Sequence, residues 1–226
     1  MLPRVIIFNG ISLDGRMDST DGSGEVDMGL YYDLAGRFGA QAMLSGSETM
    51  LSGMAKENLP EVDTVNQPEL YPNHVPYLVV VDSRGQIWNW NAIRSLPYWK
   101  EVVVLCSHST PADYLAYLKK IGVHHIVTGD EHVDLREALE ELNRRFGIRT
   151  VRVDSGGILN GVLLRAGLID EVSVLIDATL VGGTSPRSIF VAPDLEPGSK
   201  PIPLRLTHLE KLKENVVWLR YEVMKD

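Results

Sequence analysis

Cysteine is almost absent from this chain of 226 residues, in which Cys106 is the single thiol. One cysteine cannot form an intrachain disulfide, and such scarcity is typical of proteins in the reducing cytoplasm. It also excludes the zinc site of base deaminases, which needs a P-C-x-x-C pair. We interpret Cys106 as a small buried apolar side chain.

Long apolar runs and an excess of positive charge are also missing. No stretch is long enough to span a membrane, and an apolar strand begins too early to leave room for a signal peptide. The formal net charge is −8, whereas proteins that bind nucleic acid usually carry a basic face. We therefore expect a cytoplasmic protein that binds neither membranes nor nucleic acid.

Several well-known catalytic motifs do not occur. The chain has no G-x-x-x-x-G-K-[ST] phosphate loop, no G-x-G-x-x-G after a strand and no G-x-S-x-G elbow. His124 and His125 are neighbours in an expected strand, so they point to opposite faces and cannot bind one metal ion. No metal site is predicted.

What is present is an alternation of apolar strands and helices, which predicts an α/β fold with helices on both faces of a mixed, mostly parallel sheet. Expected strands cover residues 5–9, 41–45, 77–82, 102–106, 123–128, 150–153 and 172–178. Expected helices cover residues 29–39, 110–122, 134–147 and the stretch from the double glycine to 167, and another begins within 46–51. Residues 204–211 and 216–223 are typical of an antiparallel C-terminal pair, joined at Glu214-Asn215.

No domain boundary is evident, so residues 1–226 are predicted to form one domain. Residues 10–25 and 58–76 are expected to be loops. The second loop is long enough to serve as a lid or a dimer contact.

The most informative stretch is Val151–Gly183. A short strand ends in Gly156-Gly157 and a helix follows at once, so backbone N–H groups at the bend can approach a phosphate and the helix N-terminus adds partial positive charge. We predict that the Ser155–Leu159 bend binds a pyrophosphate; a simple tight turn is the alternative. A second double glycine, Gly182-Gly183, closes the next strand and could complete a nucleotide groove.

Two further turns follow expected strands. Gly46-Ser47-Glu48-Thr49 opens a helix, whose first N–H groups would point at an anion. Val81-Asp82-Ser83-Arg84-Gly85 could hold a phosphate through its serine and guanidinium, and in a dinucleotide enzyme this would be the 2′-phosphate of NADP. An ordinary strand–helix turn and an ordinary exposed arginine are the alternatives.

A fourth turn, Ile11 to Arg16, follows the first strand. Ligands of open α/β sheets bind at the carboxyl ends of the strands. The Asp14 carboxylate could there orient a polar substrate or relay a proton. Asp14-Gly15 is also a common turn pair, and the two interpretations are compatible.

Together these motifs resemble the RibD C-terminal reductase family of riboflavin biosynthesis, whose fold is like that of dihydrofolate reductase. The matching pieces are Ser12-Leu13-Asp14-Gly15, Gly46-Ser47-Glu48-Thr49, Val81-Asp82-Ser83-Arg84 and the block from Gly156 to Gly183. The resemblance covers residues 5 to about 223 and leaves 58–76 unmatched. It implies a three-layer α/β/α fold.

The resemblance also implies a homodimeric, NADPH-dependent oxidoreductase such as a 5-amino-6-(5-phosphoribosylamino)uracil reductase, which makes a ribitylamino pyrimidine phosphate from its ribosylamino form. The residues that it implies for NADPH are Gly46, Ser47, Thr49, Ser83, Arg84, Gly156, Gly157, Ile158 and Leu159. For the substrate it implies Asn9, Ser12 and Ser155, with Asp14 as the catalytic residue beside the nicotinamide.

The chain departs from the family pattern at two places. Ser155 stands where the family usually has Glu, with Asp154 one step earlier, and a shift of one residue on a strand turns a side chain to the other face. Phe8 stands where the family usually has Lys or Asn. Both changes fall on the substrate side, which leaves two alternatives: a reductase of another substrate, such as a pterin or imine, or a non-catalytic nucleotide-binding module.

Overall fold

The computed structural model describes residues 1–17, 28–57, 75–184 and 187–225. The chain forms two compact units, the first of residues 1–3 and 40–151 and the second of residues 4–39 and 152–226. Most of the predicted loop 58–76, and with it the predicted lid or dimer contact, lies outside the described residues.

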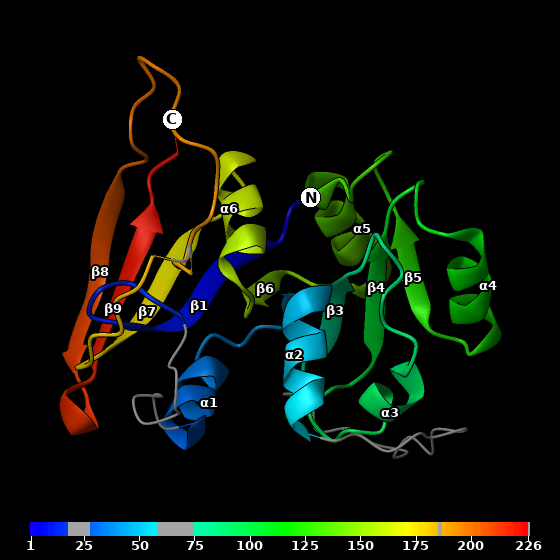
Figure 1. Ribbon diagram of the computed structural model, residues 1–226, viewed down its shortest axis with the longest axis horizontal. Coiled ribbons are helices and arrows are strands. Elements are labelled where there is room, and N and C mark those ends of the chain that lie inside the picture. The colour runs from blue at the N-terminus through cyan, green and yellow to red at the C-terminus, as the bar shows by residue number, and fades with distance from the viewer. Residues whose placement is uncertain (18–27, 58–74, 185–186, 226) are drawn as a thin grey trace. The chain divides into compact units, whose positions relative to one another are not determined.

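The first unit contains a parallel sheet in the order β5-β4-β3-β2, of which Figure 1 labels β5, β4 and β3. Its strands are β2 (Ala42–Gly46), β3 (Tyr77–Val81), β4 (Val102–Cys106) and β5 (His124–Val127). They consist largely of valine and leucine because a parallel sheet covered by helices is buried on both faces. The four strands were predicted within two residues of these bounds.

Helices cover both faces of this sheet. They are α2 (Ser47–Glu57), α3 (Trp90–Arg94), α4 (Ala112–Lys120) and α5 (Leu135–Phe146). Trp90 and Tyr114 of α3 and α4 pack with Val80 and Val104 on one face. On the other face the Phe146 ring of α5 lies 5.6 Å from that of Tyr77. The predicted arrangement is thus confirmed within this unit.

Two details of the helices differ from the prediction. Helix α3 was not predicted, because five residues are too few to show a helical period. Helix α4 begins at Ala112, two residues after the expected start, and the Thr110 hydroxyl donates to the Ser83 carbonyl at 2.8 Å. The Asp134 side chain caps the expected helix α5 by accepting from the Glu137 N–H at 3.0 Å.

The second unit contains a mixed sheet in the order β1-β7-β9-β8. β1 (Arg4–Ser12) and β7 (Glu171–Asp177) are parallel, and β9 (Val217–Val223) is antiparallel to both β7 and β8 (Leu204–Lys211). β6 (Thr150–Val153) carries the chain from the first unit into the second. The predicted antiparallel C-terminal pair is confirmed.

Helices α1 (Met28–Gly36) and α6 (Gly157–Arg165) cover opposite faces of β1. Tyr31 of α1 stacks on Phe8 with ring centres 4.6 Å apart. Asn160 of α6 donates to Asn9, the next residue of β1, at 3.1 Å. Successive side chains of a strand leave opposite faces, so these two contacts place the helices on opposite sides.

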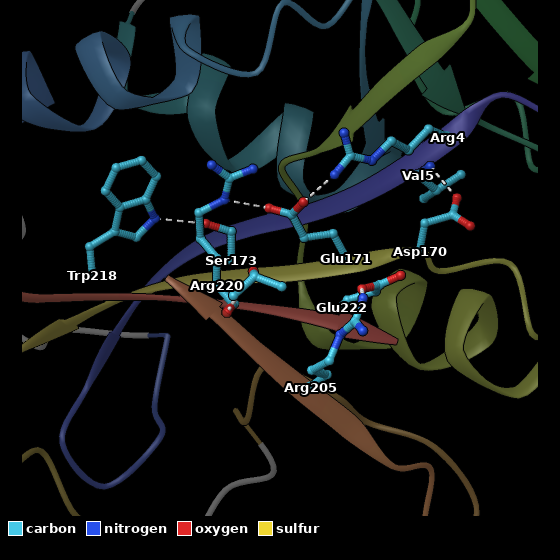
Figure 2. A network of polar contacts seen from close by, with 10 residues as sticks. Arg4, Val5, Asp170, Glu171, Ser173, Arg205, Trp218, Arg220 and Glu222 are labelled. Atoms are coloured by element: carbon cyan, nitrogen blue, oxygen red, sulfur yellow. Dashed lines mark hydrogen bonds and ion pairs between the residues drawn. The ribbon is translucent and has the colours of Figure 1, made fainter. Parts of the chain in front are cut away.

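An ion network stands at the start of β7 (Figure 2). The buried Glu171 carboxylate accepts from Arg4 and, at 2.6 Å, from Arg220 of β9. Arg220 also lies over the Phe38 and Trp218 rings. Glu171 pairs with Ile6 of β1, whereas Ser12 pairs with Asp177, so the network lies at the opposite end of the strands from Ser12. The network is therefore remote from the turn after β1 that the sequence predicts as part of the site.

Candidate functional site

The first unit brings two of the predicted turns together. Gly46 and Val81 are register partners, so the turns after β2 and β3 leave neighbouring strand ends. The Ser47 hydroxyl, at the first residue of α2, donates to the Gln86 side-chain oxygen at 3.2 Å. A hydrogen bond between side chains therefore joins the Gly46–Thr49 turn to the Asp82–Gln86 turn.

These turns expose groups that could bind an anion. Thr49 and Arg84 are exposed, and Arg84 forms no hydrogen bond or ion pair within the part of the chain that the structure describes. The first N–H groups of α2 add the positive end of a helix dipole. At the end of β2 the Ser45 hydroxyl is 1% exposed and has no hydrogen-bond partner among the described residues. The set fits a phosphorylated ligand.

The Ser83–Arg84 turn rests on a buried carboxylate. Asp82 is completely buried and accepts the N–H groups of Gln86 and Ile87 and the hydroxyl of Tyr114. Burial, together with the Asp82 charge, raises the pKa of Tyr114 above its usual range and that of the Cys106 thiol to about 12. Cys106 is fully buried, as predicted.

Sequence analysis assigned no role to Asp82 and Gln86. A local signal could have found them. An Asp followed by Ser-Arg-Gly favours a turn in which the Asp side chain accepts hydrogen bonds from backbone N–H groups a few residues later.

In the second unit, Asp14 ties two loops together. Its carboxylate accepts from the Ser12 hydroxyl at 2.6 Å, from the Val181 N–H at 3.1 Å and from the Gly182 N–H at 2.7 Å. These hydrogen bonds, that of Ser12 first, lower the pKa of Asp14 from 3.8 to about 2. At neutral pH Asp14 is therefore ionised, which favours the orienting role over donation of a proton.

The glycines at the start of α6 have a packing reason that the sequence did not reveal. A Cβ on Gly157 would lie 2.2 Å from the Ser188 carbonyl oxygen, and one on Gly161 would lie 2.0 Å from that of Val191. The Val191 N–H also donates to the Gly157 carbonyl at 2.9 Å. Close approach of residues 188–192 thus requires glycine at both positions, whatever else the bend binds.

The remaining predicted residues of this unit lie around the same helix start. Asn9 is buried and donates to the Ser155 carbonyl at 3.2 Å, so the two are in direct contact. The Ser155 side chain is also buried, Gly156 and Leu159 are half-buried, and Ile158 is 62% exposed. Pyrophosphate binding at this bend stays a prediction.

Asn9 and Ser12 do not present their side chains to the same face of β1. They are three residues apart, and side chains alternate along a strand. Asn9 faces α6, as its bond with Asn160 requires. Ser12 leaves the other face and bonds to Asp14. A ligand that touches both side chains would have to reach around the strand end.

The two departures from the family pattern both turn toward α1. Phe8 is fully buried against Tyr31 and Phe38. Asp154 lies 3.8 Å from Arg152 and interacts electrostatically with Tyr31 of α1, whose hydroxyl donates to the Phe8 carbonyl; burial raises the pKa of Asp154. That Asp154 does not replace the Glu expected at position 155 stays a prediction.

Two kinds of site are not found within the described parts of the chain. No group of three or more His, Cys, Asp and Glu side chains there could hold a metal ion. No helix among those residues has both the length and the apolar character needed to cross a membrane.

Comparison with known proteins decides the family. The model of the RibD C-terminal domain matches residues 3–218, which include most of both units. The chain belongs to the RibD C-terminal domain family. Its relatives include the 2,5-diamino-6-ribosylamino-4(3H)-pyrimidinone 5′-phosphate reductase of Methanothermobacter thermautotrophicus, 29% identical over 227 residues that make up 96% of this chain and 97% of that protein. The chain is thus a member of a family of pyrimidine reductases of riboflavin biosynthesis.

Solved structures show the same fold. The pyrimidine reductase-like protein of Corynebacterium diphtheriae superposes with a TM-score of 0.71 at 20% identity, covering 99% of this chain and 93% of that one. The dihydrofolate reductase of Enterococcus faecalis superposes with a TM-score of 0.52 at 10% identity, covering 98% and 97%. The predicted dihydrofolate-reductase-like α/β fold of this RibD C-terminal domain is confirmed.

Proposed function

We propose that this RibD C-terminal domain is an NADPH-dependent reductase that converts a ribosylamino-pyrimidine 5′-phosphate to its ribitylamino form. The observation that carries the proposal is the Ser47–Gln86 hydrogen bond, which joins two turns predicted to bind anions at neighbouring strand ends. Family membership supports the reductase class, and the name of the M. thermautotrophicus relative supports the substrate class.

The cofactor side would use the residues that the family resemblance implies for NADPH. Gly46, Ser47 and Thr49 would lie along NADPH, and Ser83 and Arg84 would bind its 2′-phosphate, because a guanidinium can donate two parallel hydrogen bonds to a phosphate. Gly156, Gly157, Ile158 and Leu159 would bind the pyrophosphate through backbone N–H groups at the start of α6. When bound, NADPH supplies the hydride.

The substrate side would use Asn9, Ser12, Ser155 and Asp14. The Asp14 carboxylate, ionised at neutral pH, would orient the substrate and hold the Val181–Gly182 corner, while another group donates the proton. The Asn9 side chain already bonds to Ser155 and Asn160. Asn9 would therefore contribute partly by holding these two residues in place.

We propose that residues 1–226 act as one reductase domain in the cytoplasm and form a homodimer. An apolar sheet face in the second unit is suited to a second copy. A register shift between Leu206 and His208 keeps Leu204, Leu206 and Leu209 on one face of the edge strand β8, opposite Val223, Tyr221 and Leu219 of β9. The three leucines are 47%, 49% and 65% exposed, and contiguous apolar exposure marks interaction surfaces.

Another substrate remains the alternative within the same class. Phe8 and Asp154 both point into the α1 layer, so this chain lacks two polar side chains that the family usually offers on the substrate side. A pterin or an imine is therefore the alternative substrate.

One assay separates these functions. Purified protein is mixed with NADPH and, in turn, the diaminopyrimidinone phosphate, its deaminated uracil counterpart and dihydropterin, and NADPH oxidation is followed at 340 nm. We expect turnover with a ribosylamino phosphate and a rise of ~100-fold in the KM for NADPH in Arg84→Ala, with little change for NADH. Turnover of dihydropterin alone would favour the alternative substrate, and no NADPH binding at all would contradict a reductase.

A further inference from the structure

Asp82 is a buried residue whose carboxylate accepts hydrogen bonds from the turn that carries Ser83 and Arg84 and from Tyr114 of α4. Gln86 N–H donates to both carboxylate oxygens at 2.9 Å, and Ile87 N–H donates to Oδ2 at 3.0 Å. The Tyr114 hydroxyl donates to Oδ2 at 2.7 Å and itself accepts from the Trp90 indole N–H at 2.9 Å. Burying a charge is costly, and here three donors compensate it.

These bonds determine the shape of the turn. The Gly85 N–H closes it on the Asp82 carbonyl at 3.2 Å, and Gly85 has a φ of +64°. A Cβ on Gly85 would lie 2.7 Å from Cγ of Tyr114, so the phenol that bonds to Asp82 also supports the backbone. Thr110 holds the far side through the Ser83 carbonyl. Thr110 therefore holds the Ser83 end of the turn, and Asp82 holds the Gln86 end.

The same carboxylate reaches the second turn through one residue. Gln86 gives its backbone N–H to Asp82 and accepts the Ser47 hydroxyl with its side chain. Asp82 thus sets the position of Gln86, and Gln86 links the Ser83–Arg84 turn to the start of α2.

We propose that Asp82 is a positioning residue that holds Ser83 and Arg84 in the arrangement needed to select a 2′-phosphorylated adenosine ligand over its unphosphorylated counterpart. The inference rests on the proposed function, because it takes the Ser83–Arg84 turn to be the 2′-phosphate site. A stabilising role alone would not require a charge, since buried ionic groups can often be replaced by apolar ones without loss of stability.

Whether Asp82→Asn weakens or strengthens binding of the 2′-phosphate distinguishes a positioning role from a purely electrostatic one. Asp82→Asn removes a negative charge close to the phosphate site, and on Coulombic grounds alone the variant should bind a phosphate more tightly. The amide has one acceptor oxygen, and its NH2 group would face N–H donors, so the variant loses part of the turn's anchoring. Positioning therefore predicts weaker binding of the 2′-phosphate.

The test is calorimetric titration of the full chain with 2′,5′-ADP and with 5′-AMP. We expect the wild type to bind 2′,5′-ADP ~100-fold more tightly and Asp82→Asn to lower this ratio ~10-fold, the effect of one charge-assisted hydrogen bond. Tyr114→Phe removes one of the three donors and should lower the ratio by less. Ile93→Val, a change in the same buried cluster on α3, is the matched control and should keep the ratio.

The outcomes test two claims separately: that Asp82 is a positioning residue, and that Ser83 and Arg84 form the 2′-phosphate site. An Asp82→Asn variant that loses affinity for both ligands equally, or gains affinity for 2′,5′-ADP, would overturn the positioning role. If that variant does not fold, an unchanged ratio in Tyr114→Phe would overturn it. A wild type that binds the two ligands equally would instead refute the 2′-phosphate site itself, and with it both proposals.

Discussion

The Asp14 carboxylate accepts the Gly182 N–H at 2.7 Å, and this bond joins the turn after β1 to the glycine corner after β7. Two loops separated by more than half of the chain thus depend on one ionised side chain. The sequence suggested a turn or a catalytic role for Asp14, and the structure adds that its carboxylate holds the backbone of Gly182.

Asp14→Asn should change how stability depends on pH. Because the pKa of Asp14 is lowered from 3.8 to about 2, its contribution is complete above pH 3.8 and is lost as the pH falls to about 2. Urea unfolding at several pH values should therefore show a difference in the free energy of unfolding between wild type and variant. This difference should become smaller as the pH falls from 3.8 to about 2. Ser12→Ala removes the largest cause of the shift, so it should raise the lower end of this window toward 3.8 and leave the upper end unchanged. A difference in stability that does not change with pH would refute this account.

Gly157→Ala and Gly161→Ala should each destabilise the protein by about 1–3 kcal/mol, because the new methyl group overlaps backbone of residues 188–191. Gly53 provides the control. It lies within α2 with open space around its Cβ position, so Gly53→Ala should stabilise by about 1 kcal/mol. Chemical denaturation measures all three, and wild-type stability of Gly157→Ala would contradict the close approach.

Glu171→Gln should lower stability without affecting NADPH binding. The buried carboxylate accepts from Arg4 and Arg220, whose side chains are 53% and 28% exposed, so we expect a loss of about 1–3 kcal/mol, less than for a fully buried pair. Thermal unfolding and NADPH titration test this together. A selective loss of NADPH affinity would show that the network serves the site after all.

Leu206→Lys should convert the proposed dimer to a monomer, since it places a charge in the middle of the exposed leucine face of β8. Arg205→Lys is the matched control, because Arg205 pairs with Glu222 on the other face of the strand. Sedimentation equilibrium distinguishes the two states. A dimer that persists in Leu206→Lys would place the interface elsewhere.

Much of the architecture follows from local pattern. Runs such as Val102–Cys106 are apolar over the length of a buried strand, and Asp134 and Gly147 mark the two ends of α5 by cap chemistry that needs no distant partner. The turns with Gly46, Ser83 and Gly156 were found from the same kind of local signal. Helix α3 was missed because its stability comes from Trp90 and Ile93 in the core rather than from a periodic sequence.

What these residues contact could not be read from the chain. The strands, most helix ends, the family and the candidate turns could be predicted from the amino-acid sequence, because they depend on neighbours a few residues apart. Three contacts became visible only in the folded protein: Asp82 supports the Ser83–Arg84 turn, Asp14 holds Gly182, and Gly157 makes room for Ser188. Each of these depends on the distance between atoms far apart in sequence, which only the packing of strands and helices establishes.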